Sequence, residues 1–581
     1  MLRAMSSAPL TQGPPHRART AAPRRPGAGF PDLIHARLAR AARPLPGFVT
    51  EPVPRSLGSP LRGQLILSGE AELAGQRIKA GRGGDAGTIW DTAARTPGFE
   101  AARQDFRWLD DLAALGSASA RGLAQRWVQD WITRYGRGRG PGWRADVAGA
   151  RLRRMIDHAP FLLAGVGDAA RADFFRALSR QARFLARRWR GAAAGLPRVE
   201  ALAGLIRAGL ALEGHDGFAD QGLRALAREC GGGIARPVME ARDPGVLLDL
   251  LVLLTDTVQA LEAVGRGAPP AVSAAIEALV PDLRGLAHSD GGLARFHGGS
   301  RSVPGAFERV LAASRNRARS AGPVMGLVRL AARRTSVLID AAPPPPGTGE
   351  RAMSVLAFEM TVGRRPLIVS GVVPGPGGRQ CAGASTLELG AGAARVPRNM
   401  PFELDESAEG FGFHGAHDGN LRRLGLTHVR RLDLSRDGGR LSGEDMLLAL
   451  EGRSQRRLRR HLRRGAGRPG FAIRLHLHPD VEAGHEGGAL VLRLKNGERW
   501  IFSHDGHADL TLESSRYHDP EQGRSRPGRQ IVLRGIVRGP ATRLRWELAR
   551  PMGAPVALRD LLPVDGIVPA VPEPGPALAE S

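Results

Sequence analysis

The chain has 581 residues, two cysteines and a formal net charge of +26, from 83 basic against 57 acidic residues. This length predicts two large domains, and so few cysteines exclude a small disulfide-stapled scaffold. A chain this basic favours an anionic partner. The 5% aromatic content, with no recognisable RNA- or DNA-binding module, argues against nucleic acid.

Residues 1–95 are predicted to form a basic, Pro-rich and partly disordered segment. The first 50 residues lack the apolar centre of a secretory signal. A mis-assigned translation start, a transit-like segment and a disordered arm all fit their composition. No uncharged apolar run reaches ~18 residues, so we expect no membrane span.

Residues 96–335 carry the period of amphipathic helices. Segments such as "GLAQRWVQDWITRY" and "RVEALAGLIRAGLAL" place apolar residues three and four apart, with short glycine-rich breaks between them. One helix start is well marked, because Asp243 can cap it and Pro244 sits where a missing N–H costs nothing. No strict repeat is visible, which leaves an irregular helical solenoid or a closed α/α toroid.

From residue 351 the period becomes that of strands. Segments such as "FAIRLHLHPDV" and "RQIVLRGIV" alternate apolar and polar residues, and Gly and Asp turns separate them. This pattern predicts an antiparallel β-sandwich over 351–565, a stiff Pro-rich linker over 336–350 and a disordered tail over 566–581. The predicted fold class is therefore α+β multidomain, with the helical domain first.

Several longer stretches can be taken together: "GGGIARPVMEARDPGVLLDLLVLL" and "HSDGGLARFHGG" in the helical half, and "AHDGN" followed by "LTHVRRLDLSRDGGRLSGED" in the sheet half. Over roughly residues 100–550 the chain resembles the heparinase II/III-like polysaccharide lyases, in particular their proteobacterial branch. The resemblance implies an N-terminal α/α toroid, a C-terminal β-sandwich, an acidic polysaccharide as partner, and a place in the cell envelope or periplasm.

The resemblance also implies β-elimination on a uronic-acid polymer. In that reaction a base removes the proton at C5, another group neutralises the adjacent carboxylate, and an acid protonates the departing oxygen. The chain differs from the family pattern at three places: Asp243 stands where relatives have asparagine, Ala384 where they have histidine, and Asn420 where they commonly have tyrosine. Two functions follow as hypotheses, a lyase and a catalytically impaired polyanion-binding protein on the same fold.

The candidate catalytic residues are Tyr135, His158, His414 and His417. Tyr135 ends a predicted helix before a Gly-rich loop, and the two later histidines lie beside "HDGN". Each has a structural alternative: an aromatic side chain closing a helix, a core histidine, or histidines of a strand or turn. Three apart on a strand, His414 and His417 would face opposite ways.

The candidate substrate-binding residues lie in the matching stretches of both halves, to which "LPRVEALAGL" also belongs: Glu200, Arg242, Asp243, His288, His297, Asn420 and His428. Helix-start stabilisation, a tight Gly turn and a cross-strand pair are the alternatives for these positions. His476 and His478 are two apart on a predicted strand and would share a face, which makes them candidates for a metal pair that lacks a third ligand. No other cofactor is predicted, and a requirement for a divalent metal stays open.

The run "RSQRRLRRHLRRGAGR" from residue 453 is the most basic segment. It fits either a solvated loop or a contact for a polyanion. Arg456, Arg457, Arg459 and Arg460 are the positions to test first. In the helical half the alternatives are Arg151, Arg153, Arg154, Arg187, Arg188 and Arg190.

Overall fold

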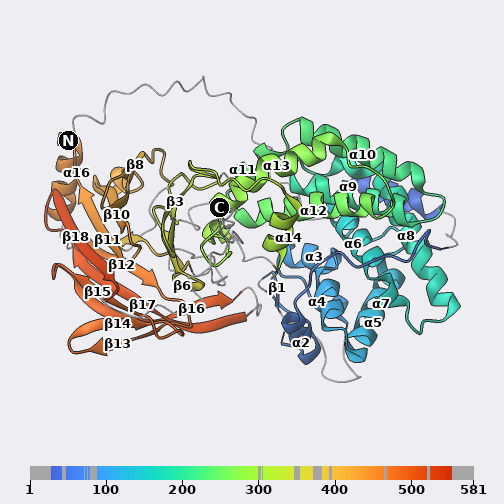
Figure 1. Ribbon diagram of the computed structural model, residues 1–581, viewed down its shortest axis with the longest axis horizontal. Coiled ribbons are helices and arrows are strands. Elements are labelled where there is room, and N and C mark those ends of the chain that lie inside the picture. Colours follow the sequence, from blue (N-terminus) through green and yellow to red (C-terminus); the bar gives the residue numbers. More distant parts are fainter. Residues whose placement is uncertain are drawn as a thin grey trace, which may run out of the picture.

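The computed structural model describes residues 28–41, 47–70, 72–74, 76–78, 88–298, 303, 305–345, 354–370, 383–390, 396–463, 468–519 and 524–551. These residues form a helical lobe and a sheet lobe that lie side by side along the long axis (Figure 1). Helices come first and antiparallel sheets follow, which confirms the predicted fold class. The predicted tail over 566–581 lies outside the described residues.

The helical lobe contains α1 (Phe30–Leu38), α2 (Pro60–Ser68), α3 (Pro97–Gln104), α4 (Arg107–Leu115), α5 (Ala118–Tyr135), α6 (Ala145–Asp157), α7 (Ala159–Leu163), α8 (Asp168–Arg188), α9 (Leu196–Ala211), α10 (Asp216–Gly231), α11 (Ala235–Ala241), α12 (Pro244–Glu262), α13 (Pro270–Gly285) and α14 (Ala306–Ala313). The predicted cap is present, because Oδ1 of Asp243 accepts a hydrogen bond from Gly245 N–H at 2.9 Å.

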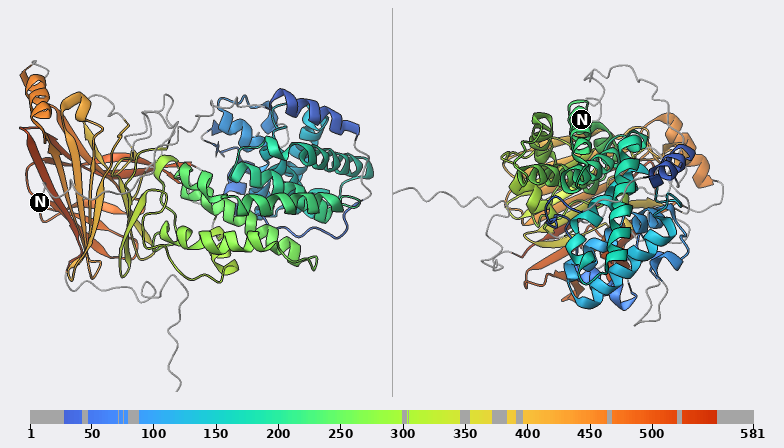
Figure 2. Two further views of the ribbon diagram at one scale, coloured as in Figure 1. Left: turned by 90° about the horizontal axis from the view of Figure 1, so that it is seen from above. Right: turned by 90° about the vertical axis from the view of Figure 1, so that its right-hand side faces the viewer.

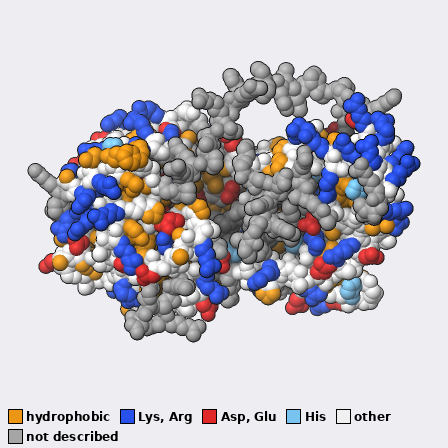
Figure 3. Space-filling view, turned by 180° about the vertical axis from the view of Figure 1, so that it is seen from behind, with side chains coloured by type: hydrophobic (Ala, Val, Ile, Leu, Met, Phe, Trp, Pro, Cys, Tyr) orange, Lys and Arg blue, Asp and Glu red, His pale blue; other side chains and the backbone are white. Residues whose placement is uncertain are grey.

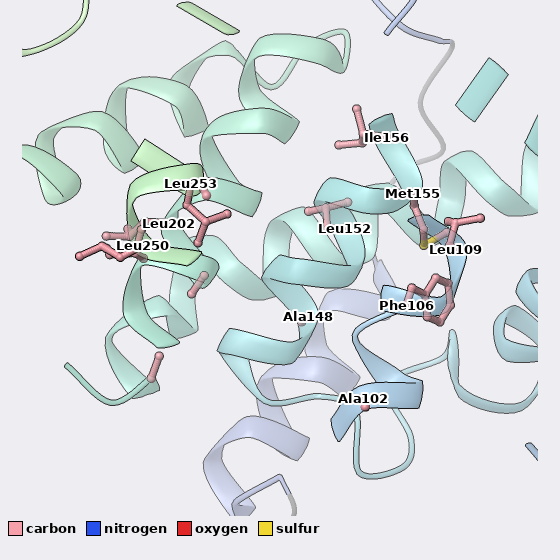
Figure 4. Close-up of a cluster of buried hydrophobic side chains, with 14 of the residues drawn as sticks. Ala102, Phe106, Leu109, Ala148, Leu152, Met155, Ile156, Leu202, Leu250 and Leu253 are labelled. Atoms are coloured by element: carbon pink, nitrogen blue, oxygen red, sulfur yellow. The ribbon is translucent and has the colours of Figure 1, made fainter. Parts of the chain in front are cut away.

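The core of this lobe is packed between α4, α6, α9 and α12 (Figure 4). Helices α6 and α9 approach closely, because both carry a glycine at the crossing. A Cβ atom at Gly149 would stand 2.3 Å from the carbonyl oxygen of Glu200, and one at Gly204 would stand 2.4 Å from the carbonyl oxygen of Gly149. Interior packing leaves no room for added atoms of this kind, so the two glycines set the spacing of the helices that position the candidate site.

The sequence predicted no membrane span, yet helix α12 is long and apolar enough to cross a membrane by length and composition alone. In the structure 67% of its apolar window is buried, and leucines such as Leu247, Leu250 and Leu254 lie in the core. Its length and apolarity therefore match those of a central core helix.

The sheet lobe consists of three antiparallel sheets. A four-stranded sheet lies next to the helices, in the order β3 (Leu327–Ala332), β4 (Thr335–Asp340), β5 (Phe358–Val362), β6 (Arg365–Ile368). The largest sheet has the order β13 (Glu482–Glu486), β14 (Ala489–Arg493), β15 (Arg499–His504), β18 (Ala541–Ala549), β11 (Arg440–Leu448), β10 (Thr427–Ser435), β9 (Gly410–His417), β8 (Phe402–Glu406). The third has the order β16 (Asp509–Asp519), β17 (Arg524–Ile536), β12 (Gly470–His476), β7 (Leu387–Leu389).

The sheet lobe begins earlier than the sequence suggested. Strand β3 falls inside the range assigned to the helical domain, and most of β4 falls inside the predicted 336–350 linker. All six residues of β4 are buried. A strand buried on both faces shows no alternation of apolar and polar residues, and this hid it from the periodicity analysis.

Candidate functional site

Three carboxylates and two arginines meet where α4, α6, α9 and α12 converge: Glu200, Asp243, Asp249, Arg107 and Arg154. The side chain of Asp249 is exposed, yet restricted hydration by the surrounding protein raises its pKa to about 6. Burial likewise raises the pKa values of Glu200 and Asp243. We call Glu200, Asp243 and Asp249 the carboxylate cluster.

The neighbouring arginines already have acidic partners. Arg107 donates to Asp105 at 2.6 Å, and Arg154 donates to Asp110 at 2.6 Å. Within the described residues no ion pair is formed by any member of the carboxylate cluster. The site therefore has excess negative charge at neutral pH, and the raised pKa values reflect how poorly that charge is hydrated.

His158 belongs to the same buried network. It lies between α6 and α7, is 3% exposed, and its Nε2 atom is 2.9 Å from an oxygen of Asp110. Burial opposes ionisation of Asp110, but Arg154 and His158 outweigh it and hold the pKa of that carboxyl well below its usual range. Both oxygens of Asp110 are thus used within the helical lobe, which gives His158 a structural partner.

Tyr135 ends α5, as predicted, and packs against protein. Its ring lies 5.7 Å from that of Trp90, and its backbone carbonyl accepts a hydrogen bond from Trp143. A Cβ atom at Gly140, whose φ is +86°, would touch the Tyr135 ring at 2.5 Å. The Gly-rich loop after α5 therefore folds over this ring.

The junction between the lobes is held by Asp340, which is 0% exposed. Its carboxylate accepts hydrogen bonds from Arg242 and, at 2.7 Å, from Ser354, and Nε2 of His297 lies 3.1 Å away. Arg242 also donates to the backbone carbonyls of Met325, Ala342, Pro343 and Gly326. The structure thus gives Arg242 and His297 a joining role, since their contacts are with the sheet lobe.

A second buried connection runs through His288. Its Nδ1 atom is 3.2 Å from Ser336 Oγ, and its Nε2 atom is 3.2 Å from Glu359 Oε2. The other oxygen of Glu359 accepts the backbone N–H groups of Arg295 and Ser370. The stretch "HSDGGLARFHGG" is therefore attached to β4 and β5 at both of its histidines.

Tyr517, which the sequence did not single out, reaches this junction from β16. It is 3% exposed, the guanidinium of Arg295 lies 5.0 Å from its ring centre, and the ring of His478 is 5.0 Å away. Burial, and then Arg295, lower the pKa of the adjacent His518. Nothing local in the sequence marks this contact, because Arg295 and Tyr517 are more than 200 positions apart.

The predicted metal pair is divided between two environments. His476 is buried and its Nδ1 atom is 2.8 Å from Ser515 Oγ, whereas His478 contacts Tyr517. Among the residues that the structure describes, the group with metal-ligand spacing is instead Asp405, His414 and Asp433.

The histidines around "HDGN" separate by face, as their spacing predicted. His414 is half-exposed, with its Nε2 atom 3.3 Å from Asp405, while His417 and His428 are buried. The ring nitrogens of these two are 3.1 Å apart, and His428 is 2.7 Å from Asp445. Asn420 is buried at the start of the short helix α15 (Leu421–Leu424).

The structure consequently places the predicted catalytic and substrate-binding residues in four groups. Glu200 and Asp243 share the carboxylate cluster, and Arg242, His288 and His297 share the junction. Tyr135 and His158 contact the helical lobe, while His414, His417, Asn420 and His428 lie in the sheet lobe. The four candidate catalytic residues therefore do not come together.

The arginine-rich run was predicted to be either a solvated loop or a polyanion contact. In the structure it forms helix α16 (Gly452–Arg463). It lies at the end of the sheet lobe away from the helices (Figures 1 and 2), where basic side chains gather on the surface (Figure 3). Arg457 donates to the carbonyl of Leu421, which ties α16 to α15. We define the basic patch as the exposed residues Arg422, Arg423, Arg453, Arg456, Arg457, Arg459, Arg460 and Arg463.

Arginines of the basic patch form no ion pair with any described acidic residue. The alternatives in the helical lobe differ. Arg151 is 0% exposed, Arg153 and Arg154 pair with acidic groups, and Arg188 pairs with Asp32 at 2.7 Å. Only Arg187 and Arg190 of that set are exposed, so the basic patch is the stronger candidate for an anion contact.

Comparison with known proteins agrees with this architecture. Residues 314–547 match the heparinase II/III-like C-terminal domain. The chain is 32% identical over 528 residues to FtsZ-localized protein C of Caulobacter vibrioides, with 85% of this chain and 88% of that protein covered.

Two solved structures share the fold at low sequence identity. A crystal structure of heparinase III matches with a TM-score of 0.61 and 10% identity, over 90% of each chain. A mutant of the heparan sulfate lyase HepC from Pedobacter heparinus matches with a TM-score of 0.50 and 11% identity, over 90% of this chain and 88% of that one.

Proposed function

The chain belongs to the heparinase II/III-like family, and from that premise we propose that it is a binding protein on the lyase fold, which recognises an anionic partner without cleaving it. The observation that carries the proposal is the carboxylate cluster, formed by Glu200, Asp243 and Asp249 on the inner helices. A second observation, the distant basic patch, provides an anion contact that does not depend on that cluster.

β-Elimination needs a group that neutralises the carboxylate of the uronic acid, because the charge of the departing proton spreads onto it. The exposed Asp249 and its neighbour Asp243 repel a carboxylate unless they are protonated. The buried cation Arg295 is 2% exposed and stacked on Tyr517, which keeps it from a polymer in solution. These contacts support binding over elimination.

The expected acid and base are also poorly supported. Tyr135 is packed under its own Gly-rich loop, and the family resemblance implies a histidine where this chain has Ala384. His417 and His428 are buried and bonded to each other and to Asp445. A general base must come within about 3 Å of the proton that it abstracts, and the imidazoles of His417 and His428 are enclosed in the sheet lobe.

The basic patch is the anion-binding surface in this proposal. Its arginines are exposed and without acidic partners among the described residues, and their planar forks suit carboxylate and sulfate groups. One structural relative is named a heparinase and the other a heparan sulfate lyase, so an acidic polysaccharide is the first ligand to test.

The relative in Caulobacter gives a second candidate function. It is named for its localisation to FtsZ, and the match extends over most of both chains. We therefore also propose that this chain associates with FtsZ. A fluorescent fusion of the full chain would distinguish a ring at FtsZ from the periplasmic or envelope distribution that the lyase resemblance implies, and a signal without FtsZ overlap would exclude this candidate.

The test of the main proposal has two readouts. The full chain is incubated with heparan sulfate, chondroitin sulfate and alginate while the ultraviolet absorbance of unsaturated uronates is followed, and its retention on immobilised heparin is measured separately. We expect retention and no absorbance change. Rising absorbance would overturn the loss of elimination chemistry, and a lack of retention would overturn polyanion binding.

A further inference from the structure

Three side chains on the outer face of the largest sheet converge on one point. Asp405 on edge strand β8 and Asp433 on β10 are both paired in register with Gly412 on β9, and His414 lies two residues further along β9. Paired residues, and residues two apart on a strand, point to the same face. One oxygen of each carboxylate and one ring nitrogen all lie within 4.8 Å of one another.

Gly412 is what allows the two carboxylates to meet. Strands β8 and β10 are separated by β9, so their residues are normally about 9.5 Å apart. A Cβ atom at Gly412 would stand 2.2 Å from Oδ1 of Asp405. The carboxylate of Asp405 thus occupies the space above β9 that any other residue would fill.

The charges around this point are unbalanced towards negative. Arg431 donates to Oδ2 of Asp433 at 2.6 Å and occupies one of its two oxygens. Glu444 stands opposite Arg431 in the register, with Arg543 and Arg545 bonded to it, and Glu403 stands opposite His414. If the carboxylate of Asp433 rotates to bind a metal cation, Arg431 still has the carboxylate of Glu444 beside it.

The donor set selects the class of ion. An imidazole with two carboxylates suits a borderline divalent transition metal such as Zn²⁺, whereas Ca²⁺ takes six to eight oxygen ligands. We propose that Asp405, His414 and Asp433 form a Zn²⁺-class site that fastens edge strand β8 to β9 and β10. This site is distinct from the candidate site at the lobe junction and does not depend on the proposed function.

The experiment uses the full chain without an affinity tag, stripped of metal by a chelator. Equilibrium dialysis against Zn²⁺, Ca²⁺ and Mg²⁺ separately, with elemental analysis, measures bound metal, and thermal unfolding measures stabilisation. We expect one bound Zn²⁺ and a raised melting temperature with Zn²⁺ alone. Zinc that fails to bind, or Ca²⁺ that binds instead, would overturn the assignment.

Three variants tie the binding to these residues. Asp405→Asn and His414→Gln each remove one ligand, and Gly412→Ala keeps all three but displaces Asp405. Each should weaken Zn²⁺ binding by on the order of 100-fold, while the metal-free proteins melt close to the parent. The matched control is His507→Gln, because His507 pairs with Asp505 at 3.3 Å outside any three-residue group that the described residues form. Equal binding by parent and all three variants would refute the site.

Discussion

The Nε2 atom of His417 lies 3.1 Å from Nδ1 of His428, and Nε2 of His428 lies 2.7 Å from Asp445. The backbone N–H of Gly419 donates to Nδ1 of His417, so His417 carries its proton on Nε2. It then donates to His428, which donates in turn to Asp445. Both imidazoles are therefore neutral and fully engaged, which makes them structural residues of the sheet lobe.

The two histidines predict a loss of stability in mild acid. Burial lowers the pKa of both, most strongly for His417. The unfolded chain then binds more protons than the folded chain at pH values below about 6.5, so the free energy of unfolding falls as pH falls through this window. The expected slope is up to about 1.4 kcal/mol per pH unit for each histidine.

Urea unfolding between pH 7.5 and 5 measures this slope. Because other groups titrate in the same range, the comparison is with His417→Asn, whose destabilisation relative to the parent should shrink as pH falls. His507→Gln, at an exposed histidine, serves as the control. A parent–variant difference that stays constant with pH would contradict the argument.

Asp249 predicts the opposite pH dependence. Its pKa is raised to about 6 by restricted hydration, so its charge destabilises the folded state above that pH and the cost disappears as the pH falls. Asp249→Asn should therefore stabilise the protein at pH 8 by less than ~1 kcal/mol, since the side chain is exposed and partly screened. Thermal unfolding at pH 8, 5 and 3.5 should show a gain that is largest at pH 8, smaller at pH 5 and absent near pH 3.5, because the carboxyl of the unfolded chain ionises above its ordinary pKa of 3.8. Equal gains at all three pH values would point to a cause other than charge.

Arg242 is predicted to hold the two lobes together. Arg242→Ala leaves Asp340 buried with its ionic partner removed, and the loss of one member of a buried pair costs about 3 kcal/mol or more. Arg236→Ala is a control, because its i,i+4 pair with Glu240 is exposed to solvent and should contribute little to the free energy of unfolding. Chemical denaturation followed by tryptophan fluorescence compares them. If the free energy of unfolding falls by the same small amount in both variants, the joining role of Arg242 is wrong.

Binding to a polyanion is predicted to depend on salt and on α16. Replacing Arg456, Arg457, Arg459 and Arg460 with serine should reduce heparin retention and flatten its salt dependence, because exposed charges are screened beyond ~8 Å at physiological ionic strength. The matched control is Arg187→Ser with Arg190→Ser, which removes exposed arginines from the helical lobe. The salt concentration at which each variant elutes from immobilised heparin is compared with that of the parent. Unchanged elution of the α16 variant would show that the basic patch is only solvated.

The two lobes could be predicted because their apolar residues recur with different periods. Helical spacing continues through α12, and Asp243 caps this helix as its neighbours indicated. Two segments were harder to predict from the sequence. Strand β4 is buried on both faces and has no alternation, and α16 has only Leu458 and Leu462, four apart and packed on the sheet lobe, to mark a helix in a run of arginine.

The candidate site could be predicted only in part. The local stretches containing Arg242, His288 and His297 do lie at the lobe junction. Their partners Asp340, Glu359 and Tyr517 come from distant strands. Such contacts depend on how the lobes dock, which no local period encodes. The spacing of His414 and His417 correctly separated their faces, but it could not show that Gly412 brings Asp405 and Asp433 together.

The basic patch lies in one lobe and the carboxylate cluster in the other, so the two ends of the molecule are not equivalent. Helix α16 lies at one end of the long axis, and α9 and α12 lie in the other lobe (Figure 1). Exposed arginines lie on α16, while α9 and α12 carry Glu200, Asp243 and Asp249. Because the arginines of the basic patch have no acidic partner among the described residues, an extended anionic surface attracts this end of the molecule before contact. The chain would arrive with α16 leading and its helices pointing outward, so the helical lobe would stay open to a different partner.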